Sequence, residues 1–571
     1  MIETFAKKTS GGSACLQSRD FIAEKWLKSA PHSHSTSGSS PPPSRSTAGM
    51  SEILNLSYGQ YSNSTITHLY NFQESQIPYT KDTKLNHQLS TFLYKSKPYG
   101  STTANYYPRA LLFDLRNGLG ALNKYEYAEE IPQLNIPILN QSQQQQLQTT
   151  QLQKHEYQKS LDQGKADASL LHTGNTKYWT DYNKLIYNPK SIITLPSYQH
   201  QYNLYGLNFN LPRQKFDLYS TGITEFKSIG TESVEDFRYW LEKCDFLQGL
   251  QLGTTIDDSW SGFTTAMIEV IQDEFFNNKE NVWIYGQYNH HEHHHLEQHR
   301  QSILYQVSQI KSFIELYKSL SLFIPLLPNY NSSMLSLLDT SSIWHTSCIP
   351  ALFINLIWGV NNQYVDQVSM FHMQENLLRG DEARKIVNEV KIVGEGDSGG
   401  SGGGTGVGTG VGGDLMDIDL TKVRDLTTLT QEARKPEISL GVSQSMENIR
   451  YINKNYIVRN KEDLNTNGNA MSIDDDDGIP TNVYTNPYMT QITNTDTFPN
   501  ILQSKNDKFH IEFNVHNGIK DYLKPYKTTI ERLKLNFNDL VEDKAELIED
   551  ISNIILSYSS GFESDDDDYY D

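Results

Sequence analysis

The clearest structural signal in the chain is Glu52–Asn63, which reads EILNLSYGQYSN. A strand-like run comes first, Gly59 follows it, and the next residues are compatible with a helix. The segment therefore predicts a strand and a helix of an α/β sheet, joined at Gly59.

Similar units follow further along the chain. Tyr107–Leu115 (YPRALLFDL) predicts a second, mostly buried strand, and residues 232–243 (ESVEDFRYWLEK) carry apolar side chains at helical spacing. A short strand at 245–252 (DFLQGLQL) and a helix over Gly262–Phe276 come next. The order strand, helix, strand, helix predicts a parallel α/β sheet.

The composition argues against several classes of protein. The chain has 571 residues, with 48 Lys and Arg against 68 Asp and Glu, which gives a net charge of −20. A general nucleic-acid binder needs the opposite balance, so no direct binding to nucleic acid is expected. The cysteines are Cys15, Cys244 and Cys348, and they share no metal-like or redox-like spacing, which suits a reducing compartment. We predict that Cys244 and Cys348 are buried packing residues.

The most apolar run of the chain is Ile349–Val360, which reads IPALFINLIWGV. It is too short to cross a bilayer, because a spanning helix needs about 20 such residues. We interpret the run as a buried strand or helix. No transmembrane segment is expected, so any work on a membrane would be done from its surface.

Polar and low-complexity stretches divide the chain. A hydrophobic content of 37% indicates sizeable unfolded segments. The expected divisions are a disordered N-terminal extension at 1–49, folded segments at 50–139 and 166–393 with a Gln-rich insert at 140–165 between them, a Gly-rich and acidic disordered linker at 394–480, a C-terminal helical segment at 481–560, and an acidic tail at 561–571. A loop at 286–299 is also expected to be disordered. In the C-terminal segment, apolar residues from Ile530 to Ile555 form one helical stripe, which more commonly packs on its own domain than on a partner.

Six histidines cluster between His290 and His299. Neutral imidazoles bind zinc or copper, but no cysteine lies nearby. A polar surface loop enriched by repeat expansion explains the run with fewer assumptions, so no metal site is predicted. No Ser/His/Asp, Cys/His or paired-carboxylate arrangement has informative spacing, and no catalytic residue is predicted.

Four segments resemble tubulin, and they follow one another in tubulin order. They are the Gly59-Gln60-x-x-Asn63 pattern, Tyr107–Gly118 (YPRALLFDLRNG), Thr173–Tyr182 (TGNTKYWTDY) and Cys244–Leu252 (CDFLQGLQL). The glycine-rich signature that follows the last segment in tubulins is not intact here, and Asn183–Gly230 forms an extra block. In both respects the chain is similar to the misato family, and it is identified as a member of that family over about Ser51–Val365.

The resemblance implies a fold and a set of site residues. The fold would be a tubulin-like Rossmann-type parallel sheet with a second α/β or α+β region, a C-terminal amphipathic helix and long disordered inserts. The implied nucleotide site would place Gly59, Gln60 and Asn63 near the phosphates, Asp114 near the metal ion and its water shell, Gly174 and Asn175 opposite the terminal phosphates, and Gly262 in the signature loop.

The signature loop is altered in this chain. Its equivalent, Thr255–Phe263, reads TIDDSWSGF, and only Gly262 remains to relax the backbone. Asp257 and Asp258 would put negative charge beside a triphosphate, and Trp260 adds bulk. A role for Asp257 as a Mg²⁺ ligand is an alternative, but we predict that tight GTP binding is lost and that there is no resident cofactor.

Other comparisons with tubulin motifs also indicate that nucleotide binding and hydrolysis are lost. The nearest match to the tubulin hydrolysis loop is Gly359–Tyr364, which lacks the acidic residue, and Asp366 is out of register. A loose alignment places Gln301 where tubulins use Asn to read guanine. The motif GGGTGVG at Gly402–Gly408 nearly spells the tubulin signature, but it lacks the flanking strand and helix and is assigned to the linker. A catalytic head-to-tail filament is therefore not expected.

The family implies a role in the distribution and inheritance of mitochondria, including the maintenance of mitochondrial DNA. We expect a non-enzymatic factor that binds protein partners at the outer surface of mitochondria and in the cytoplasm. Two alternatives are open. One is a GTP-binding switch or weak GTPase that uses Gly59, Gln60, Asp114 and Asn175. The other is an assembly factor that engages tubulin or chaperonin subunits.

Overall fold

The computed structural model describes residues 52–78, 85–97, 104–126, 152–202, 204–276, 281–288, 303–394, 437–442, 449–460, 478–502, 509–533 and 544–559. Several predictions lie outside these residues: the N-terminal extension at 1–49, the histidine cluster, Gln301, the Gly402–Gly408 motif and the acidic tail at 561–571.

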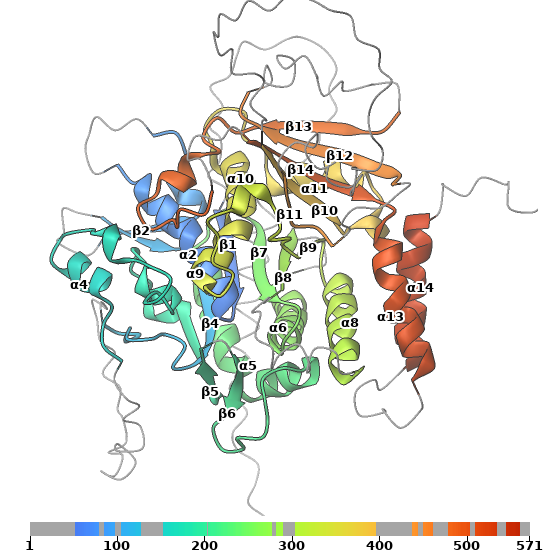
Figure 1. Ribbon diagram of the computed structural model, residues 1–571, viewed down its shortest axis with the longest axis horizontal. Coiled ribbons are helices and arrows are strands. Elements are labelled where there is room, and N and C mark those ends of the chain that lie inside the picture. Colours follow the sequence, from blue (N-terminus) through green and yellow to red (C-terminus); the bar gives the residue numbers. More distant parts are fainter. Residues whose placement is uncertain are drawn as a thin grey trace, which may run out of the picture.

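A seven-stranded sheet forms the core of the first part of the fold (Figure 1). Its strands are β1 (Glu52–Tyr58), β4 (Ala110–Arg116), β5 (Ile192–Gln201), β6 (Leu204–Asn208), β7 (Leu247–Thr255), β8 (Val282–Gln287) and β9 (Leu322–Leu326). They lie in the order β6-β5-β4-β1-β7-β8-β9, and all neighbours except β5 and β6 are parallel. The predicted parallel α/β sheet is confirmed.

Helices cover both faces of this sheet, as a buried parallel sheet requires (Figure 1). One face carries α2 (Gln60–Ser75), α9 (Ile343–Thr346) and α10 (Cys348–Asn362), and the other carries α5 (Tyr219–Glu242), α6 (Trp260–Phe275) and α8 (Ile303–Lys318). The ribbon of β2 (Leu93–Ser96) and β3 (Asn105–Pro108) and the helix α4 (Glu156–Asp162) lie outside the sheet. Short 3-10 helices span Leu89–Thr91, Ala168–Leu170, Trp179–Asp181, Pro189–Ser191, Ser333–Leu335, Glu382–Arg384 and Gln491–Asn494.

A second, five-stranded sheet follows, which confirms the expected second region. It contains β10 (Glu389–Gly394), β11 (Glu437–Ser439), β12 (Tyr451–Val458), β13 (Thr481–Thr485) and β14 (Phe509–His516), in the order β11-β10-β14-β12-β13. The β12–β13 pair is parallel and the other three pairs are antiparallel. The remaining helices are α11 (Met370–Leu378), α13 (Ile519–Arg532) and α14 (Lys544–Ser559), and the last two pack on each other and on α8.

Helix α10 lies between the two sheets. Its Phe353 side chain contacts Tyr285 of β8 and Phe513 of β14, with ring centroids 6.4 Å and 6.3 Å apart. Together α9 and α10 form a 20-residue stretch, Ile343–Asn362, that is long and apolar enough to cross a membrane. This corrects the expectation that no segment reaches that length. The stretch is buried within the protein, so the interpretation of Ile349–Val360 as a core element is confirmed.

Two of the predicted disordered segments overlap helices or strands of the structure. The Gln-rich insert predicted at 140–165 overlaps α4, which begins at Glu156 and whose Tyr157 packs with Tyr182 and Trp344. The loop predicted at 286–299 overlaps the last two residues of β8. The polar sequence of α4 conceals a helix that buries Tyr157, and β8 continues through the buried residues Gly286 and Gln287.

The divisions of the C-terminal part also need correction. The segment 394–480 is not one disordered linker, because it contains β11 and β12, and the segment 481–560 begins with β13 and β14 rather than with helix. The apolar stripe from Ile530 to Ile555 belongs to two helices, since α13 ends at Arg532 and α14 begins at Lys544. Its expected packing on its own domain is confirmed: α14 buries Tyr558, whose hydroxyl accepts a hydrogen bond from the Ile386 N–H at 2.8 Å.

Arg109 joins several elements at the amino-terminal end of the first sheet. Its buried guanidinium lies 3.3 Å from the Glu52 carboxylate, and it donates to the carbonyl oxygens of Lys243 at 2.9 Å and Ser90 at 3.1 Å. Glu52 also accepts a hydrogen bond from the N–H of Phe246 at 2.7 Å. This Arg109 network ties β1 and β4 to the end of α5 and the start of β7.

Candidate functional site

The carboxyl-terminal ends of β1, β4 and β7 meet at the centre of the first sheet. β1 has β4 on one side and β7 on the other, so the strand order reverses at this point. In open α/β sheets, ligands bind at such a point. Of the predicted site residues, the structure brings Gly59, Gln60, Asn63 and Asp114 together here.

The Asp114 carboxylate is bonded to donors of its own chain. Its Oδ2 atom accepts hydrogen bonds from Gln60 Nε2 at 2.8 Å, Asn63 Nδ2 at 3.2 Å and Trp179 Nε1 at 2.9 Å. Its Oδ1 atom accepts one from the Leu115 N–H at 2.8 Å. Burial raises the pKa of Asp114 to about 6, although these hydrogen bonds act in the opposite direction. The resemblance placed Asp114 beside a metal ion, and sequence reasoning did not identify Trp179 as its partner.

Trp260 occupies the space in front of Gly59. Gly59 has a φ angle of +85°, which glycine adopts without steric cost. A Cβ atom built on Gly59 would lie 2.5 Å from Trp260 Nε1, so the indole ring is in close contact with the backbone. The ring is held there by Phe216 and Phe263, with centroid distances of 5.0 Å and 5.8 Å. The backbone that a phosphate would approach therefore faces an aromatic ring.

Asp258 places a carboxylate at the N-terminus of α6. Its Oδ1 atom accepts hydrogen bonds from the Trp260 N–H at 2.8 Å and from the Thr255 hydroxyl. An anion at this position interacts favourably with the free N–H groups and the dipole of the helix. Burial, and then the charge of Asp257, raise the pKa of Asp258 to about 7. By the resemblance a phosphate would use this helix end, and here a carboxyl group of the chain itself accepts the hydrogen bond of the Trp260 N–H.

These residues do not fit a nucleoside triphosphate. The indole ring of Trp260 covers Gly59, and the carboxylate of Asp258 holds the start of α6. Above about pH 7, where Asp258 is ionised, a phosphate beside it would bring like charges together in a buried place, which costs free energy unless a cation lies between them. Within the described residues, no group of three or more His, Cys, Asp or Glu side chains is placed to hold such a cation. The carboxyl ends of β1, β4 and β7 thus form a packed aromatic and polar cluster.

Gly262 lies inside α6 and not in a phosphate loop, which corrects its predicted role. A Cβ atom on Gly262 would lie 2.0 Å from the carbonyl oxygen of Tyr219 in α5. A Cβ atom on Gly222 of α5 would lie 1.8 Å from the carbonyl oxygen of Ser259. The two glycines therefore allow α5 and α6 to cross with their backbones in contact.

Gly174 and Asn175 lie in a loop that borders the cluster. Asn175 Nδ2 donates to the Leu170 carbonyl at 2.8 Å, and its Oδ1 accepts from the His172 N–H at 3.1 Å. The Asn175 side chain therefore shapes its own loop, while Gly174 is exposed. The loop leads into the 3-10 turn that carries Trp179, which is its connection to Asp114.

The segment compared with the tubulin hydrolysis loop is largely the end of α10. A Cβ atom on Gly359 would lie 2.1 Å from Asn486 Nδ2, so this glycine permits close packing of the helix. Asn361 Nδ2 donates to the Val368 carbonyl at 2.9 Å and holds the turn toward α11. These contacts explain the local Gly and Asn residues by packing.

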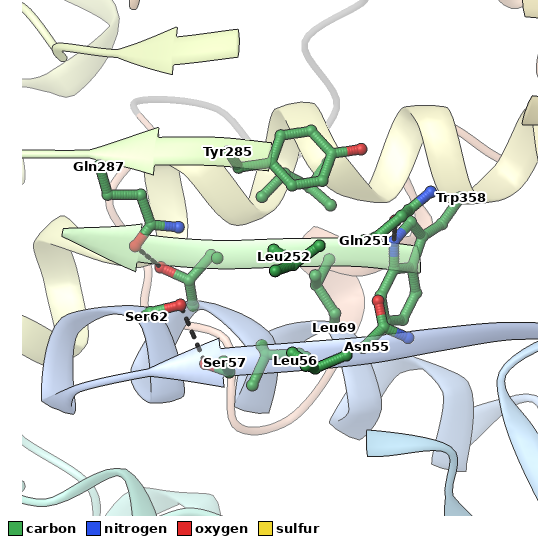
Figure 2. Close-up of a pocket in the computed structure, with 14 residues that line it drawn as sticks. Asn55, Leu56, Ser57, Ser62, Leu69, Gln251, Leu252, Tyr285, Gln287 and Trp358 are labelled. Carbon is green, nitrogen blue, oxygen red and sulfur yellow. Dashed lines mark hydrogen bonds between the residues drawn. The ribbon is translucent and has the colours of Figure 1, made fainter. Parts of the chain in front are cut away.

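A small cavity lies beneath the cluster, between β1, β7, β8 and the helices α2 and α10 (Figure 2). Its volume is about 20 Å³, which suits a water molecule and is far below the size of a nucleotide site. Trp358 Nε1 donates to Gln251 Oε1 at 2.6 Å, whereas Gln251 Nε2 and the Tyr285 hydroxyl have no hydrogen-bond partner in the described part of the chain. A water molecule in this cavity would satisfy such groups.

The raised pKa of Asp258 predicts a dependence of stability on pH. An unfolded Asp titrates near pH 4, so between there and about pH 7 the folded state binds the extra proton. The stability that this proton contributes is present below pH 4 and is lost as the pH rises toward 7. From pH 5 to pH 8, the free energy of unfolding should therefore fall by about 2–3 kcal/mol in wild type relative to Asp258→Asn.

Urea unfolding of both proteins at the two pH values measures this difference. Asp273→Asn, at an exposed position of the same helix, is the matched control for the loss of one carboxylate. A difference between wild type and Asp258→Asn that stays constant with pH would contradict the prediction.

Comparison with known proteins gives consistent matches along the chain. Residues 51–163 match a family model described as the Misato Segment II tubulin-like domain, and residues 168–358 match one described as a tubulin domain. The chain is 41% identical to Protein DML1 of Candida albicans, over 91% of this chain and 100% of the relative. It is 37% identical to Protein DML1 of Debaryomyces hansenii, over 91% of this chain and 99% of the relative, and 36% identical to Protein DML1 of Scheffersomyces stipitis, over 91% and 100%.

Proposed function

The chain belongs to the misato family of tubulin-related proteins, and on this premise we propose that it is a non-enzymatic factor for mitochondrial distribution and inheritance. The role would include the inheritance of mitochondrial DNA, and the protein would act by binding protein partners. Its place of action would be the outer surface of mitochondria and the cytoplasm. The mitochondrial role is what the family implies, and fold alone does not carry it.

One observation supports the non-enzymatic part of the proposal: the Trp260 ring packs on Gly59, where a phosphate would approach the backbone. The carboxylate of Asp258 at the start of α6 adds a second obstacle to an anionic ligand. A tubulin frame with a filled nucleotide site is suited to present surfaces to partners.

Removal of the chain from its cells tests the cellular role. We expect mitochondria to be unevenly partitioned and mitochondrial DNA to be lost from a fraction of daughter cells, and both defects should be reversed by the wild-type chain. Normal inheritance of mitochondria and of mitochondrial DNA after the removal would contradict the proposal.

Equilibrium binding of GTP with Mg²⁺ to the purified full chain, with ATP as control, tests the alternative of a GTP-binding switch. We expect no binding at millimolar nucleotide, because Trp260 and Asp258 stand in the site. Binding of GTP at micromolar strength, without binding of ATP, would favour the switch.

Gly174→Asp separates the two functions in cells. Gly174 is exposed, and a Cβ atom there would have its nearest contact at 3.4 Å, so the fold should accept the substitution. By the resemblance this position faces the terminal phosphates, so the added charge would disable a switch. We expect normal mitochondria with Gly174→Asp, as with the control Gly174→Ala.

The alternative of an assembly factor predicts instead that the purified chain captures tubulin or chaperonin subunits from cell extract.

A further inference from the structure

The loop from β6 to α5 presents seven consecutive exposed residues, Phe209–Lys215, with the sequence FNLPRQK. Two of them are large and apolar: Phe209 is 52% exposed and Leu211 is 55% exposed. The loop projects beyond the end of β6 at the lower edge of the molecule in Figure 1. We name it the 209–215 loop.

The 209–215 loop has a defined shape, so the exposure of its apolar side chains is built into the fold. Asn208 Oδ1 accepts hydrogen bonds from the N–H groups of Asn210 at 3.0 Å and Leu211 at 2.9 Å. The backbone N–H of Asn208 donates to the Gln214 carbonyl at 2.9 Å, and the N–H of Phe216 donates to the Gly206 carbonyl at 2.7 Å. These bonds close a turn whose tip carries Leu211.

The charge of this region is opposite to that of the whole chain. Residues 204–216 contain Arg213 and Lys215 and no Asp or Glu, whereas the chain has a net charge of −20. Arg213 and Lys215 are both exposed. A third cation, Arg116, lies over the Phe209 ring at 4.6 Å from its centroid. Within residues 204–216 the charged side chains are therefore all positive, and the next acidic residue, Asp217, is buried.

We propose that the 209–215 loop is a contact site for an anionic lipid surface. Phe209 and Leu211 enter the interfacial region of the bilayer, and Arg213 and Lys215 lie among the headgroup phosphates. Because the rest of the chain is acidic, repulsion from the same surface turns the body of the protein away and orients the loop toward the membrane. That this membrane is the outer surface of mitochondria rests on the proposed function. The contact between the 209–215 loop and an anionic lipid surface does not depend on it.

A lipid surface fits this loop better than a protein partner. A stable protein interface uses about 20–30 residues and about 800 Å² from each side, which a seven-residue projection does not supply. An apolar tip with flanking cations needs no shaped groove on the other side, since headgroups and acyl chains rearrange around it. A short insertion of this kind gives weak, reversible binding.

Co-sedimentation of the full chain with vesicles tests the proposal. The vesicles are phosphatidylcholine alone, or phosphatidylcholine with 30% phosphatidylglycerol at about 0.1 M salt. We expect binding to the anionic vesicles and little binding to the neutral ones. Arg213→Gln/Lys215→Gln should weaken the binding by about fivefold for each charge removed. Phe209→Ser/Leu211→Ser should weaken it by at least about tenfold, since little of the inserted apolar area remains.

Leu337→Ser/Leu556→Ser is the matched control, because these leucines are 50% and 63% exposed on other parts of the surface. It should bind like wild type. Anionic vesicles that do not bind the wild-type chain, or that bind the loop variants as well as wild type, would overturn the proposal. The proposed cellular role would survive that result, because it is tested separately by removing the chain from cells.

Discussion

Arg109→Met is expected to lower the free energy of unfolding by about 3–5 kcal/mol. The guanidinium is buried and lies 3.3 Å from the buried Glu52 carboxylate, so its loss leaves that charge without its ionic partner. The two carbonyl oxygens of Ser90 and Lys243 lose their donor at the same time. Urea unfolding at pH 7 measures the change.

The control for this prediction is Arg238→Met, which breaks surface ion pairs with Glu235 and Glu274, whose side chains are 58% and 41% exposed. An exposed pair contributes about 0–1 kcal/mol, so this variant should unfold close to wild type. Arg109→Met/Glu52→Gln should recover part of the loss, because it removes the unpaired charge as well. Equal stabilities of Arg109→Met and Arg238→Met would show that the Arg109 network does not hold the amino-terminal end of the sheet.

The first sheet could be predicted because its signals are local. A run such as EILNLSY followed by Gly59 and a helix is contained in about a dozen residues, and the same unit recurs before α6. The Arg109 network was present in the sequence as the Pro-Arg-Ala pattern, but nothing local tells that its partner is Glu52, 57 residues away.

The second sheet was missed in part because its strands depend on distant partners. β10 pairs with β14, which lies more than 100 residues later, and a glycine-rich stretch separates β10 from β11. β14 alternates buried Phe509, Ile511 and Phe513 with less buried polar residues, so its pattern was readable. The low complexity of 394–480 and the helical stripe after Ile530 concealed these strands.

The candidate site was predictable in its chemistry and not in its geometry. The sequence alone shows that the signature loop has lost glycines and gained Asp257, Asp258 and Trp260. It does not show that the Trp260 ring fills the space at Gly59, or that Asp258 caps the start of α6. Those facts depend on where α6 begins, and the start lies at Trp260, ahead of Gly262.

Trp260→Ala is expected to lower the free energy of unfolding by about 3–5 kcal/mol, since it removes a buried indole ring from contact with Phe216 and Phe263. It also opens space in front of Gly59. GTP binding should remain absent at millimolar concentration, because the Asp258 carboxylate still caps α6. Urea unfolding and equilibrium binding of GTP with Mg²⁺ give the two measurements.

Phe263→Ala is the matched control, because it removes a buried ring from the same helix while Trp260 itself is kept and still packs on Phe216. It should show a similar loss of stability and no GTP binding. The double variant Trp260→Ala/Asp258→Gly removes both obstacles to a phosphate, the Trp260 ring at Gly59 and the Asp258 carboxylate at the start of α6. If both must be removed, this double variant should bind GTP at least tenfold more tightly than Trp260→Ala. Micromolar GTP binding by Trp260→Ala alone would show that the ring is the only barrier and that Asp258 does not repel the phosphates.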